Sequence, residues 1–216
     1  MPAPVIRPYR PADRDAVYDV CRRTVFPRAD AVEVHPDLMA DIFAGPYLHL
    51  QPELAFVLDD GDRAVGYVLG AADTVSFAAD FADVWLPLVA DRHPAPGPPP
   101  HTADEEMRSL LHDPGRMVHP ALADHPAHLH IDLLPQVQRS GYGRRLMWTL
   151  LAALRTRGVP RVHLGMVPEN VAARAFYDRL GFTEITVPGA VAGTYLGRST
   201  EVPAPLSEVT QPPLRG

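Results

Sequence analysis

The feature that most constrains this chain is a pair of closely spaced glycines between an apolar run and an amphipathic segment. The apolar run covers residues 129–134, the sequence QRSGYG occupies 138–143, and a helix is predicted over 144–157. Glycine lets the backbone approach a ligand and turn its N–H groups inward. The first turn of the helix adds unpaired N–H groups and the positive end of the helix dipole. The sequence therefore predicts an anion-binding loop between a strand and a helix.

This loop departs from the two most familiar phosphate-binding motifs. A Walker A loop needs Lys followed by Ser or Thr after its last glycine, whereas Arg144 and Arg145 stand here. The third glycine of a Rossmann fingerprint would fall at Leu146. A nucleotide-phosphate binder that reuses the loop stays an open alternative, and the missing residues argue against it.

Strands and helices alternate along most of the chain, which predicts an α/β fold. The predicted strands cover residues 5–7, 54–58, 64–69, 129–134, 161–166, 182–187 and 192–196. The predicted helices cover residues 14–24, 36–43, 77–89, 102–111, 144–157 and 171–180. Gly45 and Pro46 are expected to end the second of these helices, because both residues interrupt helical patterns.

The middle of the chain is predicted to be an insertion between two strands. It covers residues 73–127 and holds two helices and a proline-rich stretch at 94–100. Proline lacks the backbone donor and fixes φ, so this stretch is expected to have no regular structure. We expect a single domain over residues 1–199 that carries the insertion, and a disordered tail over 200–216.

Composition argues against several kinds of partner. The formal net charge is −6 and no segment is strongly basic, which argues against nucleic acid. No apolar run approaches the ~18 residues of a membrane helix and the start has no leader-type apolar region, so we expect no membrane contact and a cytoplasmic location. Cys21 is the single cysteine, which excludes an internal disulfide and fits a reducing compartment.

A second motif lies downstream of the glycine loop, at the predicted start of the next helix. The sequence NVAARAFY occupies 170–177, and Leu180, Gly181 and Phe182 follow it. Residues 138–143 resemble the Gln/Arg-x-x-Gly-x-Gly/Ala motif of the GNAT superfamily of acyl-CoA N-acetyltransferases. The second motif resembles the Asn-x-x-Ala-x-x-x-Tyr-x-x-x-Gly-Phe pattern of the same family. The two motifs together are far more specific than either one alone.

The resemblance to this family extends beyond the two motifs, and it is stronger in some segments of the chain than in others. It is best over residues 120–198, while segments at 46–48, 52–57 and 65–70 are similar to bacterial relatives of the acetyltransferase-like C-terminal domain of O-GlcNAcase. The insertion at 73–127 departs from a minimal family member, and we expect it to shape the acceptor side.

The resemblance implies a fold and a reaction. The fold would be a twisted, mixed and mostly antiparallel sheet flanked by helices, with the cofactor between two splayed parallel strands at 129–134 and 161–166. The reaction would be transfer of an acetyl group from acetyl-CoA to an amine by direct attack. The acceptor would be a small molecule or a protein lysine. A non-catalytic acyl-CoA-binding or interaction module is the alternative.

The resemblance also implies which residues contact acetyl-CoA. Backbone groups of the first splayed strand would pair with the pantetheine, the glycine loop would hold the pyrophosphate, and the second motif would line the other wall. Tyr177 would protonate the leaving thiolate, although it could also be a core aromatic residue. The implied cofactor-binding residues are Leu133, Leu134, Gln138, Arg139, Ser140, Gly141, Tyr142, Gly143, Arg144, Asn170, Ala173, Phe176 and Tyr177.

Polar side chains that alternate along the strand at 129–134, starting one residue before it, suggest a catalytic base. His128, His130 and Asp132 point to one face of this strand, because side chains in a strand alternate. An amine must lose a proton before it attacks, so His130 or Asp132 is a candidate base or relay. The alternative is a hydrogen-bonded pair of these two residues, buried under a helix. The histidines at 119–130 match no zinc spacing, so no metal is expected.

Overall fold

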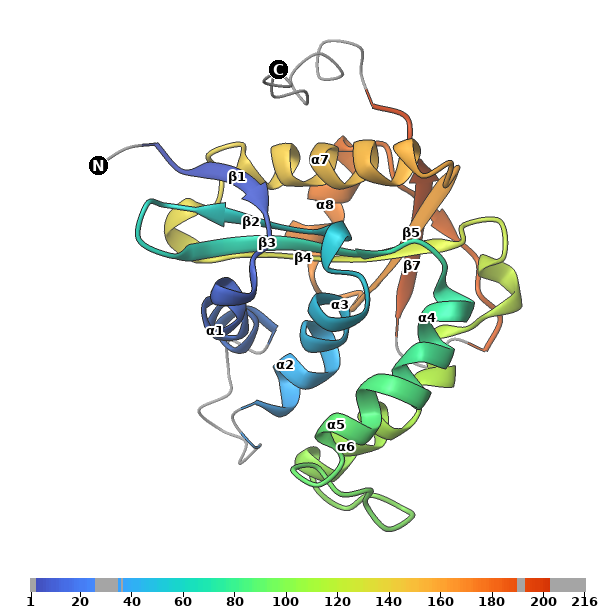
Figure 1. The fold of residues 1–216 in the computed structure, drawn as a ribbon. Helices are drawn as coiled ribbons and strands as arrows, with labels where there is room; N and C mark the ends of the chain where they lie inside the picture. Colours follow the sequence, from blue (N-terminus) through green and yellow to red (C-terminus); the bar gives the residue numbers. More distant parts are fainter. Residues whose placement is uncertain (1–2, 26–34, 36, 190–192, 203–216) are drawn as a thin grey trace.

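The computed structural model describes residues 3–25, 35, 37–189 and 193–202, and these residues build a mixed sheet (Figure 1). The strand order is β1-β2-β3-β4-β5-β7-β6. Among the described strands, β4 and β5 are the parallel pair, and the other neighbours are antiparallel. The strands are β1 (Val5–Pro8), β2 (Ala55–Asp59), β3 (Ala64–Ala71), β4 (Ala127–Leu133), β5 (Arg161–Met166), β6 (Thr183–Ile185) and β7 (Thr194–Ser199). The expected mixed, mostly antiparallel sheet is therefore confirmed.

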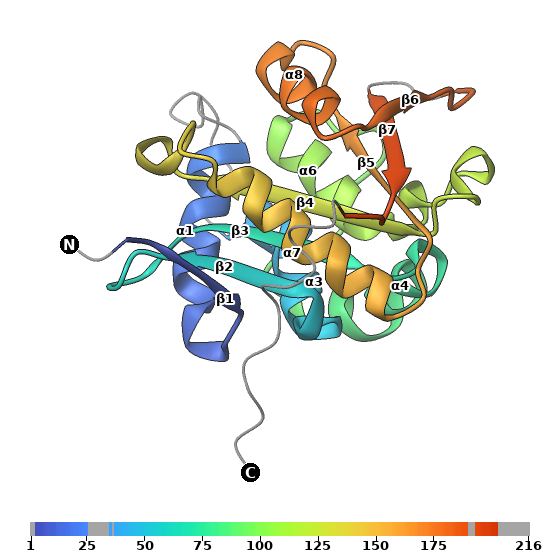
Figure 2. The same cartoon turned by 90° about the horizontal axis from the view of Figure 1, so that it is seen from above.

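Helices cover both faces of this sheet. Figures 1 and 2 show α7 and α8 on one side, with α7 lying across the strands, and α1, α2 and α3 on the other side. A π-helical turn at Phe81–Trp85 joins α4 to α5. The helices are α1 (Arg14–Val25), α2 (Leu38–Phe43), α3 (Gly45–Leu50), α4 (Thr74–Asp80), α5 (Leu86–Val89), α6 (Ala103–His112), α7 (Tyr142–Thr156) and α8 (Val171–Arg179).

α2 ends at Phe43, as the sequence predicts, and Gly45 and Pro46 then begin α3, a helix that the sequence analysis did not predict. Pro46 is tolerated in the first turn of α3, where its missing N–H group has no intrahelical partner in any case. Gly45 is needed for a different reason. A Cβ atom there would meet the Tyr18 hydroxyl and would lie 2.5 Å from the Trp85 ring. Tertiary packing therefore determines this boundary, and the local pattern does not show it.

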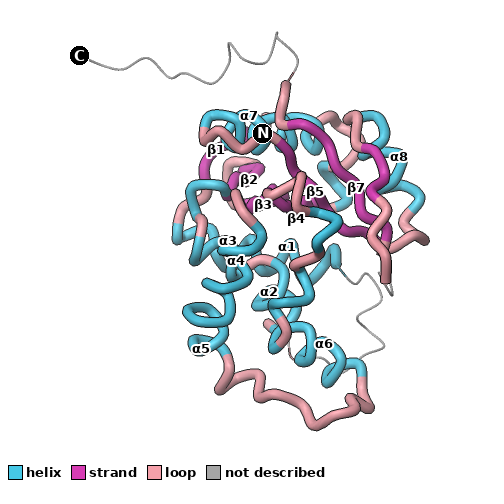
Figure 3. The backbone as a smooth tube through the Cα atoms, turned by 90° about the vertical axis from the view of Figure 1, so that its right-hand side faces the viewer, coloured by secondary structure: helices cyan, strands magenta, loops and turns pink. Residues whose placement is uncertain are grey.

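The insertion lies between β3 and β4, which are neighbours in the sheet. Its helices α4, α5 and α6 extend away from the sheet on the side of α1 to α3 (Figures 1 and 3). Thr102 caps α6 and Glu105 completes the capping box, as the sequence predicts. Across the described residues, no helix has both the length and the apolar character needed to cross a bilayer.

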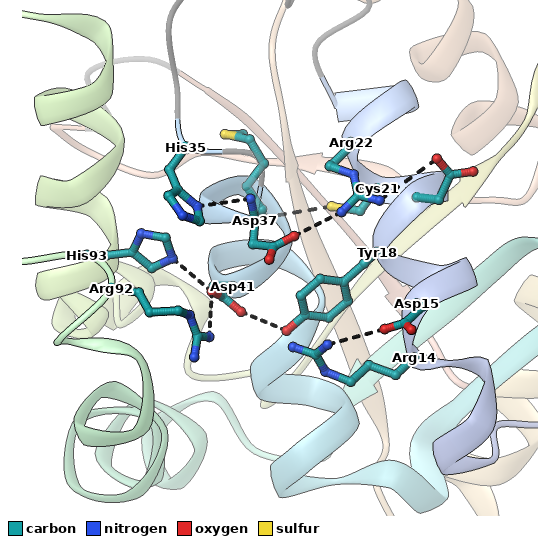
Figure 4. Close-up of polar contacts among 12 residues, drawn as sticks. Arg14, Asp15, Tyr18, Cys21, Arg22, His35, Asp37, Asp41, Arg92 and His93 are labelled. Atoms are coloured by element: carbon teal, nitrogen blue, oxygen red, sulfur yellow. Dashed lines mark hydrogen bonds and ion pairs between the residues drawn. The ribbon is translucent and has the colours of Figure 1, made fainter.

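A buried polar cluster ties the insertion to the body of the protein (Figure 4). Asp41 of α2 is 0% exposed and accepts hydrogen bonds from the Tyr18 hydroxyl (2.7 Å) and from Arg92 (2.9 Å). His93 Nε2 lies 2.8 Å from the same carboxylate, and Trp85 donates to the Asp41 carbonyl (2.8 Å). The cluster thus joins α1, α2 and the insertion through one carboxylate.

The end of the described chain differs from the expected boundary of the tail. Thr200 is only 3% exposed, its N–H group donates to the Pro160 carbonyl (3.0 Å), and its hydroxyl donates to the Val159 carbonyl (2.7 Å). The packed part of the chain therefore extends beyond residue 199. Residues 203–216 of the predicted tail lie outside the described residues.

Candidate active site

The two parallel strands separate after a short contact. β4 and β5 pair at Ala127 with Val162 and at His128 with His163. β4 then continues to Leu133 and β5 to Met166, and the described residues show no further pairing between them. An opening therefore lies in the sheet beside the second half of β4, as the sequence motifs lead us to expect.

The backbone of β4 presents alternate residues to this opening. The Leu134 N–H group donates to the Val65 carbonyl of β3 (2.9 Å), so the N–H group of Leu134 points away from the opening. In an antiparallel ladder the hydrogen-bonding groups alternate in direction from one residue to the next. The N–H groups of Leu133 and Ile131 therefore face the opening.

Leu134 was expected to pair with the pantetheine, and its backbone contradicts this expectation. Its N–H group bonds to β3, and its carbonyl accepts from the Val137 N–H group (3.0 Å). Leu133 keeps its N–H group toward the opening, while its carbonyl accepts from Gln138 Nε2 (2.8 Å). The Ile131 N–H group faces the opening too, which the sequence analysis did not predict and only the register of β4 against β3 reveals.

The glycine loop leads into α7 with its N–H groups unpaired. Gly141 is the N-cap residue of α7 and has φ +83°, and Arg139 has φ +59°. None of the N–H groups from Arg139 to Arg144 donates a hydrogen bond to a described residue. Arg145 is the first residue whose N–H group bonds back, to the Gly141 carbonyl (3.2 Å). Six adjacent donors at a helix N-terminus form a site for an anion.

The second motif faces this loop from α8. A Cβ atom on Gly143 would lie 3.3 Å from the Phe176 ring and 3.7 Å from Leu133, so the glycine lets α8 and the end of β4 approach the loop closely. Asn170 caps α8 by accepting from the Ala173 N–H group (3.0 Å), as expected for this position. The structure thus brings the two sequence motifs and the end of β4 together.

Tyr177 lies between two aromatic rings of the same region. Its side chain is 9% exposed and makes edge-to-face contacts with Phe176 (5.2 Å between ring centroids) and Phe182 (5.5 Å). Burial, and secondly the nearby Asp132 carboxylate, raise the pKa of this phenol well above its usual value of 10. The phenol is therefore a protonated donor near neutral pH.

The alternating polar residues of β4 share one face, as predicted, and have separate partners. Asp132 accepts from the Tyr67 hydroxyl (2.7 Å), and burial raises its pKa to about 6. Burial, with Arg116 as the lesser cause, lowers the pKa of His130 to about 4. His128 is held at both ring nitrogens, by the Tyr47 hydroxyl (2.7 Å) and by Thr74 (2.9 Å). The alternative of a hydrogen-bonded pair of His130 and Asp132 is not found among the described contacts.

A cavity of about 190 Å³ lies on this face, where β4 and β5 separate. Its walls are formed by α2 and α3, by residues 128–130 of β4 and by residues 163–165 of β5. Tyr195 of β7 closes one side, and Arg116 and Met117 of the 3₁₀ turn η5 (Pro114–Met117) close another. The insertion thus contributes to this cavity. Within the described residues, no three His, Cys, Asp or Glu side chains gather as metal ligands would.

Comparison with known proteins identifies the class of this chain. The chain matches the Acetyltransferase (GNAT) family over residues 19–182 and belongs to this family. It is an acyl-transferring enzyme of the N-acetyltransferase class, and the fold of seven strands flanked by helices agrees with that class.

Three similar proteins show how much of this chain each comparison covers. The crystal structure of SsHAT is 58% identical with a TM-score of 0.89, and the match covers 93% of this chain and all of that one. Protein O-GlcNAcase from Mus musculus is 29% identical over 187 residues, which are 83% of this chain and 20% of the relative. This chain therefore spans about a fifth of that protein. The ribosomal protein bS18-alanine N-acetyltransferase from Salmonella typhimurium is 35% identical over 86 residues, covering 40% and 54% of the two chains.

Proposed function

We propose that this protein transfers an acetyl group from acetyl-CoA to the amine of an acceptor by direct attack. The observation that carries the proposal is the row of unpaired N–H groups from Arg139 to Arg144 at the start of α7, which follows the end of β4, the part of that strand that is no longer paired with β5. Acetyl-CoA would supply an acyl group activated as a thioester. Its diphosphate is the kind of anion that such a loop binds without a metal.

The remaining contacts would follow from the surfaces beside the loop. The Ile131 and Leu133 N–H groups face the opening and would pair with the amide and thioester carbonyls of the pantetheine arm. Residues of the second motif, with Phe176 over Gly143, would form the opposite wall. Arg139, Ser140, Tyr142 and Arg144 would surround the phosphates. Asn170 and Ala173 would border the same wall while Asn170 caps α8.

Two side chains would handle protons. The acceptor ammonium must lose a proton, and Asp132 suits this task better than His130, since a pKa of about 6 leaves a carboxylate that is ionised yet basic at pH 7. The amine nitrogen then forms a bond to the acyl carbon while the carbon–sulfur bond breaks. Tyr177 would give its proton to the departing sulfur, because its pKa keeps the phenol protonated until that charge develops. The second proton that the nitrogen loses on becoming an amide would restore the phenol.

The binding half of the proposal is tested by placing a carboxylate in the loop. Gly141→Glu should weaken acetyl-CoA binding at least about tenfold in calorimetry, because like charges in a binding site cost more than about 1.4 kcal/mol. Gly158→Glu is the matched control. Gly158 has a similar positive φ of +74° and open space around its Cβ position, but it lies at the other end of α7. Equal loss of affinity in both variants would contradict the assignment of the loop.

The catalytic half is tested by thiol release over a panel of amines. Tyr177→Phe should lower kcat by about 10²-fold or more and leave acetyl-CoA affinity unchanged, since it removes a proton donor and little else. Acetyl-CoA binding without thiol release from any amine would contradict transfer and would favour a module that only binds acyl-CoA.

A further inference from the structure

The cavity beside the opening is lined by an arginine, Arg116, that has no counter-ion among the described residues. Arg116 donates from Nε to the Leu110 carbonyl (3.1 Å), which fixes the direction of its guanidinium. No described carboxylate lies within 4.0 Å of this group, and its Nη atoms donate no hydrogen bond to a described residue. The guanidinium therefore has free donors at the wall of the cavity.

Other partly buried arginines among the described residues have partners for their Nη atoms. Arg7 pairs with both Asp13 (2.7 Å) and Asp59 (2.7 Å), and Arg198 donates to the Leu180 and Glu201 carbonyls. Burial lowers the pKa of Arg116, and the smaller opposing influences of Tyr47 and Asp113 do not cancel this effect. Removing a guanidinium from water without a partner is costly, so an anionic partner from outside would relieve that cost.

The other walls of the cavity agree with an anion. None of the described residues that line it is acidic. His130 and His128 are neutral near pH 7, because burial lowers the pKa of both. The Tyr195 hydroxyl is within 3.2 Å of His119 Nε2 and adds a polar group beside Arg116. The net charge of −6 belongs to the whole chain, whereas among the described residues that line this cavity the charged side chain is a cation, Arg116.

We propose that Arg116 binds a carboxylate of the acceptor, so that the substrate is a small amine that also carries a carboxylate. This inference rests on the proposed function. A guanidinium offers donors in a planar fork that matches a carboxylate. The volume of about 190 Å³ is below the ~300–1,000 Å³ of sites for drug-sized ligands, which favours a small acceptor. The cavity opens where β4 and β5 separate, so an amine held there faces the thioester.

Matched amines test the inference. Glycine, β-alanine and 4-aminobutanoate are compared with ethylamine, propylamine and butylamine, in which a methyl group replaces the carboxylate. We expect at least one acid to exceed its partner about tenfold or more in kcat/KM, as a charge-assisted pair would give. The preference should vanish in Arg116→Met, survive in part in Arg116→Lys, and stay intact in Arg155→Met. Arg155 is exposed on α7 and controls for the change in net charge.

Two further measurements distinguish a failure of the carboxylate site from a failure of the proposed function. Calorimetry of the preferred acid with the CoA-loaded protein should show binding that Arg116→Met abolishes, while thermal unfolding checks that the variant is folded. If wild type binds acetyl-CoA and acetylates both members of each pair equally, the carboxylate site is wrong and the proposed function stands. If acetyl-CoA does not bind, both proposals fail. A preference confined to 2-aminoethyl phosphate over ethanolamine would overturn the carboxylate in favour of a phosphate.

Discussion

At the scale of single residues, the chemistry of Asp132 is set by neighbours far away in the sequence. Burial raises its pKa to about 6, and the hydrogen bond from Tyr67 opposes this shift by favouring the ionised form. A base works only when deprotonated, so kcat/KM should rise with pH and level off above about 6. Tyr67→Phe should move the midpoint to higher pH, because the stabilising hydrogen bond is lost. The measurement is a pH–rate profile at saturating acetyl-CoA.

The pH–rate profile of Asp132→Asn tests whether Asp132 is the group that titrates. This substitution should remove the acid limb near pH 6 and lower the rate across the range, since the amide accepts no proton. Asp104→Asn changes the same group in a pair with Arg108 on α6 (2.7 Å) and should leave the profile unchanged. A limb near pH 6 that persists in Asp132→Asn would assign the titration to another group.

Sequence patterns predict where some residues of the candidate site lie, and they contain no sign of the contacts of others. The alternation of His130 and Asp132 places them on one face, and the structure confirms that face. Ile131 and Leu134 are different, because the direction of a backbone N–H group depends on the register between β4 and β3. Tyr67 is likewise invisible as a partner of Asp132, since 65 residues separate the two in the chain.

At the scale of elements, strong local signals predict most helices and fail where packing decides. The cap at Thr102 and the glycines after α7 and α8 place those boundaries near the observed ones. The start of α3 is different. Gly45 approaches the Tyr18 hydroxyl and the Trp85 ring, which come from α1 and from the insertion. No window of neighbouring residues contains that information.

Gly45→Ala should therefore destabilise the protein. An added methyl group has to displace Tyr18, which donates to Asp41, or Trp85, which donates to the Asp41 carbonyl. Overpacking of this kind costs about 1–3 kcal/mol. Gly97→Ala is the control, since a Cβ atom there meets nothing within 4 Å, and its effect should stay within about 0.5 kcal/mol. Urea unfolding measures both variants, and equal free energies of unfolding would contradict the packing argument.

At the scale of the whole molecule, the question is whether the insertion unfolds as a separate unit or shares one core with the body of the protein. Its position between two predicted strands was visible in the sequence as an interruption, whereas its attachment was not. Asp41 lies about fifty residues before Arg92 and His93 and still joins them in one buried cluster. Because breaking a buried ionic contact is costly, unfolding the insertion alone would leave the Asp41 carboxylate without two of its partners.

This coupling predicts a single cooperative transition for the insertion and the body. The chain has two tryptophans, and each reports on one part: Trp85 is buried in the insertion, and Trp148 lies in α7 beneath Arg198 (4.8 Å to the ring centroid). Trp148→Phe and Trp85→Phe leave one reporter each, and fluorescence during urea unfolding should give the midpoint found by circular dichroism in the same variant. An earlier midpoint for Trp85 alone would show that the insertion unfolds first, so that the wall carrying Arg116 could open while the glycine loop at 138–143 stays folded.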